Sequence, residues 1–83
     1  MRTNDPFQEE VYRVTMENII SALKSRRLML LITQMDLAEI SGVALITIKK
    51  LESGKARPTL ETLCKLADVL GMEIKLEVKG PRV

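Results

Sequence analysis

Four basic side chains lie close together in the second half of the chain, between residues 44 and 58. They are Lys49, Lys50, Lys55 and Arg57, and the only acidic residue among them is Glu52, so this stretch has a net charge of +3. Lysine and arginine side chains at this density can bind the phosphates of a nucleic acid. The alternative is an ordinary solvated helix face, and charge alone does not separate the two interpretations.

The sequence offers little for catalysis or for metal binding. It has no histidine and a single cysteine, Cys64, which excludes an intrachain disulfide and a zinc site of the usual ligand types. It also has no glycine-rich phosphate loop and no nucleophile with a recognisable base. Cys64 lies between Leu63 and Leu66 in a helical pattern, so we expect it in the core or at its boundary. We therefore predict that the protein is not an enzyme and has no cofactor.

Composition indicates one small domain with an aliphatic core. The 83 residues are 46% hydrophobic and 29% charged, and the only aromatic residues are Phe7 and Tyr12. A core of this size is modest, so association with a second copy would be unsurprising. The longest uncharged apolar run, 28–32, is too short to cross a bilayer, and no signal peptide is recognisable. We expect a cytoplasmic protein.

Five helices are predicted from caps and from apolar spacing. Asp5 and Pro6 would begin a short helix that runs towards Val14, and Thr15 would cap a second helix over residues 16–30. Further helices are expected at 33–40, at 45–51 and from Thr59 to Gly71.

The last part of the chain changes from helical to twofold periodicity. Apolar residues alternate with charged ones from residue 72 to residue 79, which is typical of a strand with one apolar face. A single strand cannot satisfy its own backbone hydrogen bonds. We therefore expect it to pair with the same strand of a second chain, with an apolar dimerisation face made of Met72, Ile74, Leu76 and Val78.

Residues at fixed spacing mark two of these helices and the turn between them. Thr33 would cap the first helix, Gly42 would permit the sharp turn, and Ile48 would anchor the second helix to the core. The complete set is Ile32, Thr33, Gln34, Leu37, Ala38, Gly42, Val43, Thr47, Ile48, Glu52, Gly54 and Pro58. With this set the chain resembles the Cro/C1-type (XRE) helix-turn-helix family. The resemblance implies a DNA-binding protein that places residues 45–52 in the major groove.

The resemblance also implies the residues that touch DNA. Leu45, Ile46 and Lys50 fall where relatives read base edges, although the two aliphatic residues can contact only thymine methyl groups. Ala44 stands where a serine or threonine usually caps the recognition helix. The implied DNA-binding residues are Thr33, Gln34, Ala44, Leu45, Ile46, Thr47, Lys49, Lys50, Lys55 and Arg57.

A structural ion pair is a further feature that the resemblance implies. Arg27 and Glu52 fall where relatives join the first long helix to the end of the recognition helix. The alternative is two unrelated surface charges, but both residues sit on otherwise apolar faces. Leu31 stands where relatives commonly have glycine, and the sequence gives no reason for it.

Both ends of the chain look like antitoxins of the HigA and HipB kind. Residues 17–23 before the motif, the helix that follows Pro58 and the terminal strand resemble those proteins, in which a homodimer binds a palindromic operator in its own promoter and also binds a toxin. The acidic arm, residues 5–12, would then face the toxin, or else simply pack on the domain. A stand-alone repressor without a toxin, and a protein-interaction module with weakened DNA binding, remain alternatives.

These patterns together predict an all-α fold. We expect a five-helix lambda-repressor-like helix-turn-helix domain with one C-terminal β-strand that pairs across a dimer. Residues 1–15 would form an N-terminal arm with a short helix, and 16–71 the DNA-binding domain. Residues 72–79 would be the dimerisation strand, and 80–83 a tail.

Overall fold

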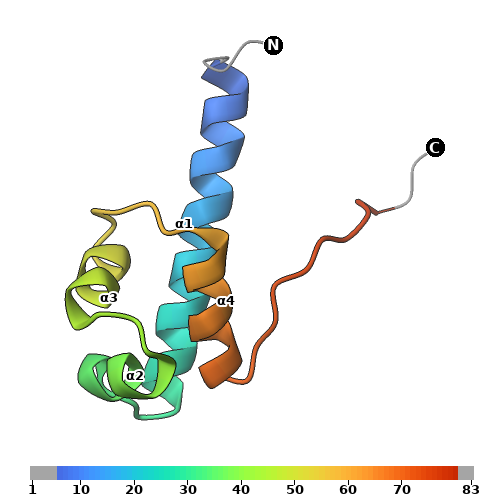
Figure 1. Ribbon diagram of the computed structural model, residues 1–83. Coiled ribbons are helices and arrows are strands. Elements are labelled where there is room, and N and C mark those ends of the chain that lie inside the picture. Colours follow the sequence, from blue (N-terminus) through green and yellow to red (C-terminus); the bar gives the residue numbers. More distant parts are fainter. Residues whose placement is uncertain (1–5, 81–83) are drawn as a thin grey trace.

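Four helices make up the structure, which is a computed structural model that describes residues 6–80. They are α1 (Pro6–Met29), α2 (Gln34–Ser41), α3 (Leu45–Glu52) and α4 (Leu60–Val69). The C-terminal half of α1 lies beside the other three helices, and its N-terminal half projects beyond them (Figure 1). The chain after α4 runs away from the helices as an extended segment.

The first 24 helical residues form one helix, so the prediction of two helices separated at Thr15 is wrong. Helix α1 begins at Pro6 and continues without interruption to Met29. Neither glycine nor proline lies inside it after Pro6, and a threonine in a helix interior costs only about 0.7 kcal/mol relative to alanine. A possible N-cap at Thr15 therefore does not end the helix that precedes it.

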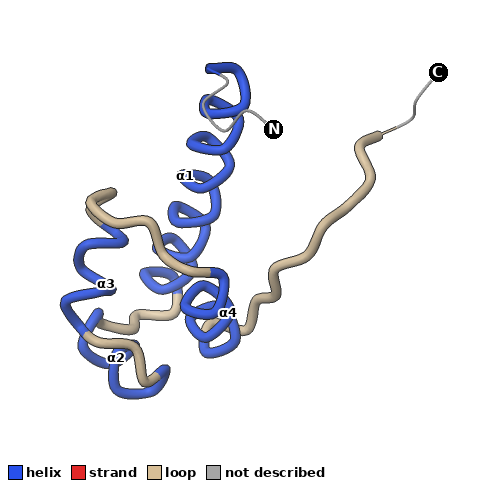
Figure 2. Tube along the Cα trace, turned by 45° about the horizontal axis from the view of Figure 1, so that its top comes forward, coloured by secondary structure: helices blue, strands red, loops and turns tan. Residues whose placement is uncertain are grey.

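The predicted C-terminal strand is also absent from the described residues. Residues 72–80 have no regular secondary structure, and Figure 2 shows them as an extended loop. Within a single chain no neighbouring strand supplies the backbone hydrogen bonds that an alternating pattern needs. Met72 and Ile74 pack against the core, whereas Leu76 and Val78 are 99% and 90% exposed. The fold is therefore four helices with an extended C-terminal segment.

The core is aliphatic, as composition indicates. Phe7 and Tyr12 lie on the projecting half of α1 and are exposed. Side chains from all four helices and from the turn before α3 fill the interior between them. The buried hydrophobic residues are Leu23, Leu37, Val43, Ile48, Leu51, Leu63, Leu66, Ala67 and Leu70.

Local caps fix the ends of the shorter helices. The hydroxyl of Thr33 accepts a hydrogen bond from the backbone N–H of Asp36, and the Asp36 carboxylate accepts one from the N–H of Thr33, at 2.9 and 3.2 Å. Gly42 ends α2 with a φ of 78°, a left-handed conformation that favours glycine. Thr59 caps α4 through the N–H of Thr62. Each of these helix ends is therefore specified by residues next to it in the sequence.

Leu31 adopts the left-handed conformation at the end of α1. Its φ is 59°, and the N–H of the following residue, Ile32, donates to the carbonyl of Arg27 at 3.1 Å. This arrangement closes many helices and usually has glycine at the left-handed position. The Leu31 side chain is 89% exposed, so the described residues provide no packing that offsets the strain.

Candidate nucleic-acid interface

Helices α2 and α3 form a helix-turn-helix. A short turn through Gly42 and Val43 joins them, and the Val43 side chain is buried between them and the rest of the core. Ile48 and Leu51 are 0% and 1% exposed, and burying side chains of this size stabilises the fold by roughly 1.5–3 kcal/mol each. These two anchors hold α3 by one face, so its opposite face points into solvent.

The outer face of α3 is part aliphatic and part basic. Ile46 is 58% exposed, and Lys49 and Lys50 are also exposed. Leu45 and Thr47 are half-buried. This face can offer methyl contacts through Ile46 and ammonium donors through the two lysines.

Ala44 precedes α3 and is exposed. It has no side-chain oxygen to bond the backbone N–H groups of the first turn, and no side-chain cap is present at this helix end. The N-terminus of α3 therefore keeps uncapped N–H groups towards solvent.

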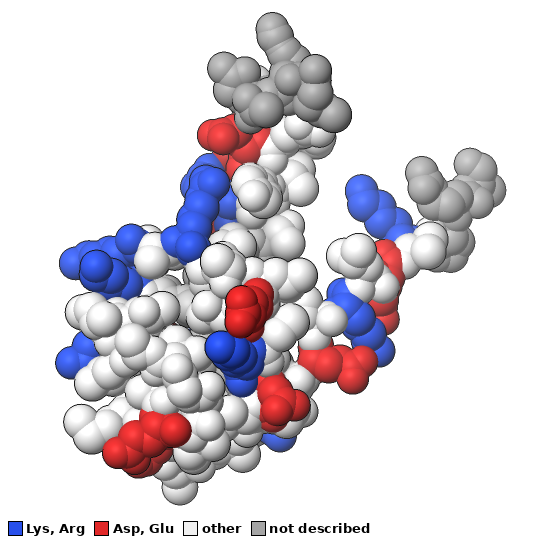
Figure 3. Space-filling model, viewed as in Figure 1, with Lys and Arg blue, Asp and Glu red and all other residues white. Residues whose placement is uncertain are grey.

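The loop between α3 and α4 extends the basic surface. Lys55 and Arg57 are exposed there, and Figure 3 shows lysine and arginine side chains gathered over α3 and this loop. Within residues 6–80, ion pairs join Arg13, Arg27 and Lys65 to carboxylates, but no ion pair involves the four cations of α3 and the loop. Lys49, Lys50, Lys55 and Arg57 are therefore available to an external anion.

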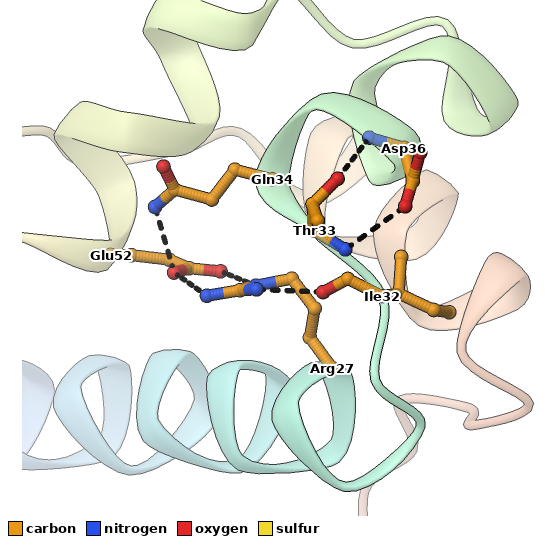
Figure 4. A network of polar contacts seen from close by, with 6 residues as sticks. All are labelled: Arg27, Ile32, Thr33, Gln34, Asp36 and Glu52. Atoms are coloured by element: carbon orange, nitrogen blue, oxygen red, sulfur yellow. Dashed lines mark hydrogen bonds and ion pairs between the residues drawn. The ribbon is translucent and has the colours of Figure 1, made fainter.

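A buried ion pair connects α1 to the end of α3. Arg27 donates two hydrogen bonds of 2.8 Å to the two carboxylate oxygens of Glu52, and both side chains are less than 10% exposed. The remaining Arg27 nitrogen donates to the carbonyl of Ile32 at 2.7 Å, as Figure 4 shows. Arg27 and Glu52 thus fix the angle of α3 relative to α1, and with it the direction of the exposed face.

The surroundings of the pair favour its charged form. Burial would raise the pKa of Glu52, but hydrogen bonds from Arg27 and Gln34 and the positive charge of Arg27 outweigh it, so this pKa lies below its ordinary value of 4.5. The hydrogen bonds to Glu52 raise the pKa of Arg27. Both groups therefore stay ionised at neutral pH, and each satisfies the other's buried charge.

The start of α2 serves the fold as well as the candidate surface. Gln34 is half-buried, and its Nε2 donates to Glu52 Oε1 at 3.0 Å, so only one of its two amide hydrogens is available for a phosphate. Thr33 is exposed, but its hydroxyl accepts the capping bond from Asp36. Sequence reasoning places both residues beside DNA and does not foresee the bond from Gln34 to Glu52.

Two further contacts have no signal in the sequence. Arg26 Nε donates to the carbonyl of Leu70 at 2.9 Å, which places a cation at the C-terminal end of α4, where the helix dipole favours it. The guanidinium of Arg57 lies over the ring of Tyr12, 5.2 Å from its centroid. The partners are far apart in the sequence, so no local pattern could have indicated either contact.

Other classes of site find little support among residues 6–80. Cys64 is exposed on α4, so the expectation that it lies in the core or at its boundary is wrong. The described residues contain no group of His, Cys, Asp or Glu side chains suited to a metal ion. None of the described helices has the length and apolarity needed to span a membrane.

Comparison with known proteins points in the same direction. The chain is 45% identical over 42 residues to the cryptic phage CTXphi transcriptional repressor RstR of Vibrio cholerae serotype O1 (strain ATCC 39315 / El Tor Inaba N16961). That match spans 51% of this chain and 38% of the repressor, so well over half of the repressor lies outside the match. The structure is also similar to a chain of a toxin-antitoxin module from Streptococcus pneumoniae, with a TM-score of 0.66 and 31% identity. That similarity covers 94% of this chain and 82% of the other.

Residues 23–76, more than half of the chain, match the family described as helix-turn-helix. This range contains α2, α3, α4 and the C-terminal end of α1. The geometry of α2 and α3 and the family match confirm the resemblance seen in the sequence. The chain belongs to the helix-turn-helix family, of the Cro/C1 (XRE) type.

Proposed function

We propose that this protein is a DNA-binding transcriptional regulator that acts as an antitoxin and represses its own operon. The main support for this proposal is a set of four exposed cations on α3 and the loop after it, which have no carboxylate partner within residues 6–80. They are Lys49, Lys50, Lys55 and Arg57. Four unpaired cations beside an exposed helix face suit a phosphate backbone that flanks a major groove. A binding function of this kind needs neither catalysis nor a cofactor, and we propose that the protein acts in the cytoplasm.

In this proposal α3 lies in the major groove. Lys50 donates to a base edge, and guanine is its best acceptor there. Leu45 and Ile46 pack against thymine methyl groups. The remaining residues of the surface contact phosphates or flanking bases around the groove. They are Thr33, Gln34, Ala44, Thr47, Lys49, Lys55 and Arg57. Sequence preference then depends on few hydrogen bonds, so we expect a large share of the affinity to come from phosphates.

We also propose that two copies associate through residues 72–79. Leu76 and Val78 are almost fully exposed, and apolar side chains in this state favour burial against a partner. Met72 and Ile74 pack against the core of their own chain. In this proposal they also form part of the contact between the two copies. A homodimer would present two copies of α3 and would match an operator made of two inverted half-sites.

The toxin would bind the projecting half of α1. Four apolar side chains there, Phe7, Val11, Tyr12 and Val14, are between 41% and 75% exposed. Glu9 and Glu10 lie on the same half of α1, so this surface suits a partner with a basic, partly apolar face. Asp5, which belongs to the predicted arm, lies outside the described residues. The similarity to a chain of a toxin-antitoxin module supports this part of the proposal.

The first experiment is a titration of the protein against its own promoter fragment and against random DNA, at two salt concentrations. We expect tighter binding to the promoter and a steep loss of affinity as salt rises, because binding releases counterions from phosphates. Lys49→Glu combined with Lys50→Glu should abolish binding and leave the circular dichroism spectrum unchanged. Equal affinity of the wild-type protein for both DNAs, or no effect of the two charge reversals, would contradict the proposal.

A stand-alone repressor is the second candidate, because the repressor RstR of Vibrio cholerae matches half of this chain. The two candidates differ in the partner protein. Co-expression with the product of a short neighbouring gene, followed by purification of a stable complex, would favour the antitoxin. Promoter-selective binding without such a partner would favour the repressor.

A further inference from the structure

We infer that the DNA-binding surface extends onto α1, where Tyr12 holds the Arg57 guanidinium in position for a phosphate beside the major groove. This inference rests on the proposed function, since it names a positioning residue for the same DNA contact. It is carried by the contact between Tyr12 and Arg57 and by the unpaired donors of Arg57.

Arg57 has a long, exposed side chain that could otherwise adopt many rotamers. Its guanidinium is 5.2 Å from the centroid of the Tyr12 ring, within the range of an attractive cation–π interaction. The ring is anchored by α1, which is a continuous helix at this point. Tyr12 therefore lowers the number of conformations that Arg57 has to give up when it binds a phosphate.

The contact with the ring leaves the N–H donors of Arg57 unused. A cation–π interaction engages the positive charge of the guanidinium and does not consume its N–H groups. Among the described residues, Arg57 has no hydrogen bond and no ion pair. It can thus donate to two phosphate oxygens without leaving the ring.

Basic, acidic and apolar side chains all lie beside this contact. Tyr12 and Arg57 border a small cavity of about 210 Å³ between α1 and the loop, which Arg13, Glu17 and the apolar Met16 and Ile20 also line. The donors of Arg57, and not the cavity, are therefore the place for a phosphate. Arg13, which lies on α1, is a second exposed cation beside Arg57, although it forms an ion pair with Glu10. Arg13 and Arg57 extend the basic surface of α3 and its loop towards α1, so a phosphodiester is the ligand that fits its charge.

The test compares four variants by titration with the promoter fragment and with random DNA. Tyr12→Leu removes the ring, Tyr12→Phe keeps it, and Arg57→Lys keeps the charge without the planar group. We expect Tyr12→Leu and Arg57→Lys each to weaken binding roughly two- to fivefold on both DNAs alike, since phosphate contacts do not depend on sequence. Tyr12→Phe should bind as the wild-type protein does. Asn18→Gln changes an exposed residue of α1 that belongs to none of the proposed surfaces, and it serves as the control without effect.

Two further measurements distinguish positioning of Arg57 by the ring from a purely structural role of the ring. In an Arg57→Ala background, Tyr12→Leu should cause no further loss of affinity, and Arg57→Ala itself should lower the slope of log affinity against log salt by about 0.9. Thermal melting verifies that each variant is folded. The inference is overturned if the wild-type protein binds DNA and the Tyr12→Leu variant binds equally well or more tightly. It is also overturned if Tyr12→Leu weakens binding as much in the Arg57→Ala background as in the wild-type protein. Failure of the wild-type protein to bind its promoter would instead overturn the proposed function.

Discussion

Replacing Glu52 with glutamine would leave a buried positive charge without its counter-charge. Arg27 is 7% exposed, and two of its three hydrogen-bonded nitrogens donate to the Glu52 carboxylate. Breaking a buried ion pair by removing one charge costs ~3–5 kcal/mol. Glutamine keeps one carbonyl acceptor, so we expect a loss at the lower end, about 3 kcal/mol. A domain of ordinary stability has roughly 5–15 kcal/mol in total, so the variant should unfold at a clearly lower denaturant concentration.

Urea unfolding followed by circular dichroism measures this loss. Glu61→Gln is a matched control, because Glu61 pairs with Lys65 at 3.5 Å but its side chain is 78% exposed. The same chemical change there should cost less than about 1 kcal/mol. In a double variant, Arg27→Met with Glu52→Gln, the loss should be smaller than the sum of the two single losses, because no unpaired charge remains. Equal losses for Glu52→Gln and Glu61→Gln would refute the reasoning.

Four further predictions concern acid stability, the helix end, DNA contacts and association. The pKa of Glu52 is lowered in the folded state, so the stability that its carboxylate contributes is present above pH 4.5 and is lost as pH falls through the folded pKa. The difference in unfolding free energy between wild type and Glu52→Gln should therefore narrow below pH 4.5. A difference that stays constant with pH in urea titrations would contradict this. Leu31→Gly should stabilise the fold by about 0.5–1 kcal/mol in thermal melting, because it relieves a positive φ, whereas Leu31→Ala should give no such gain; destabilisation by glycine would count against the strain. Lys50→Ala should relax preference at one base pair by ~1–3 kcal/mol, while Arg57→Ala should weaken promoter and random DNA alike; equal losses for both variants on both DNAs would sink these assignments. Leu76→Glu with Val78→Glu should leave the helices intact and give a monomer in sedimentation velocity, and a persistent dimer would exclude this segment as the contact.

Some of the fold could be predicted because its signals are local. The caps at Thr33, Gly42 and Thr59 act within one helical turn, so the helices that they bound agree with the sequence patterns to within one or two residues. The buried anchors of α3 follow from helical spacing, and Ile48 is indeed fully buried. The match of residues 23–76 to the helix-turn-helix family confirms the resemblance that the same residues suggest.

Other features depend on competition between local alternatives. At Thr15 the chain can either begin a new helix or continue the existing one, and continuation keeps one backbone hydrogen bond per residue. At residues 72–79 the alternating pattern favours a strand, but a strand exists only where a neighbour completes its hydrogen bonds. The sequence contains both alternatives in each place, and only the folded chain selects between them.

The family resemblance implied the pair of Arg27 and Glu52, but the other contacts between distant residues were decided by the tertiary structure. Arg57 meets the ring of Tyr12, and Arg26 meets the carbonyl of Leu70, because α1 packs across the domain at one particular angle. That angle depends on the summed packing of an aliphatic core, which has no directional pattern in the sequence. The sequence by itself therefore determined the caps at Thr33, Gly42 and Thr59, the buried anchor Ile48 and the family to which the chain belongs, because these signals are local or recur in relatives. The tertiary structure determined where α1 begins and ends and which other polar side chains meet, since such contacts need specific distances that only packing sets.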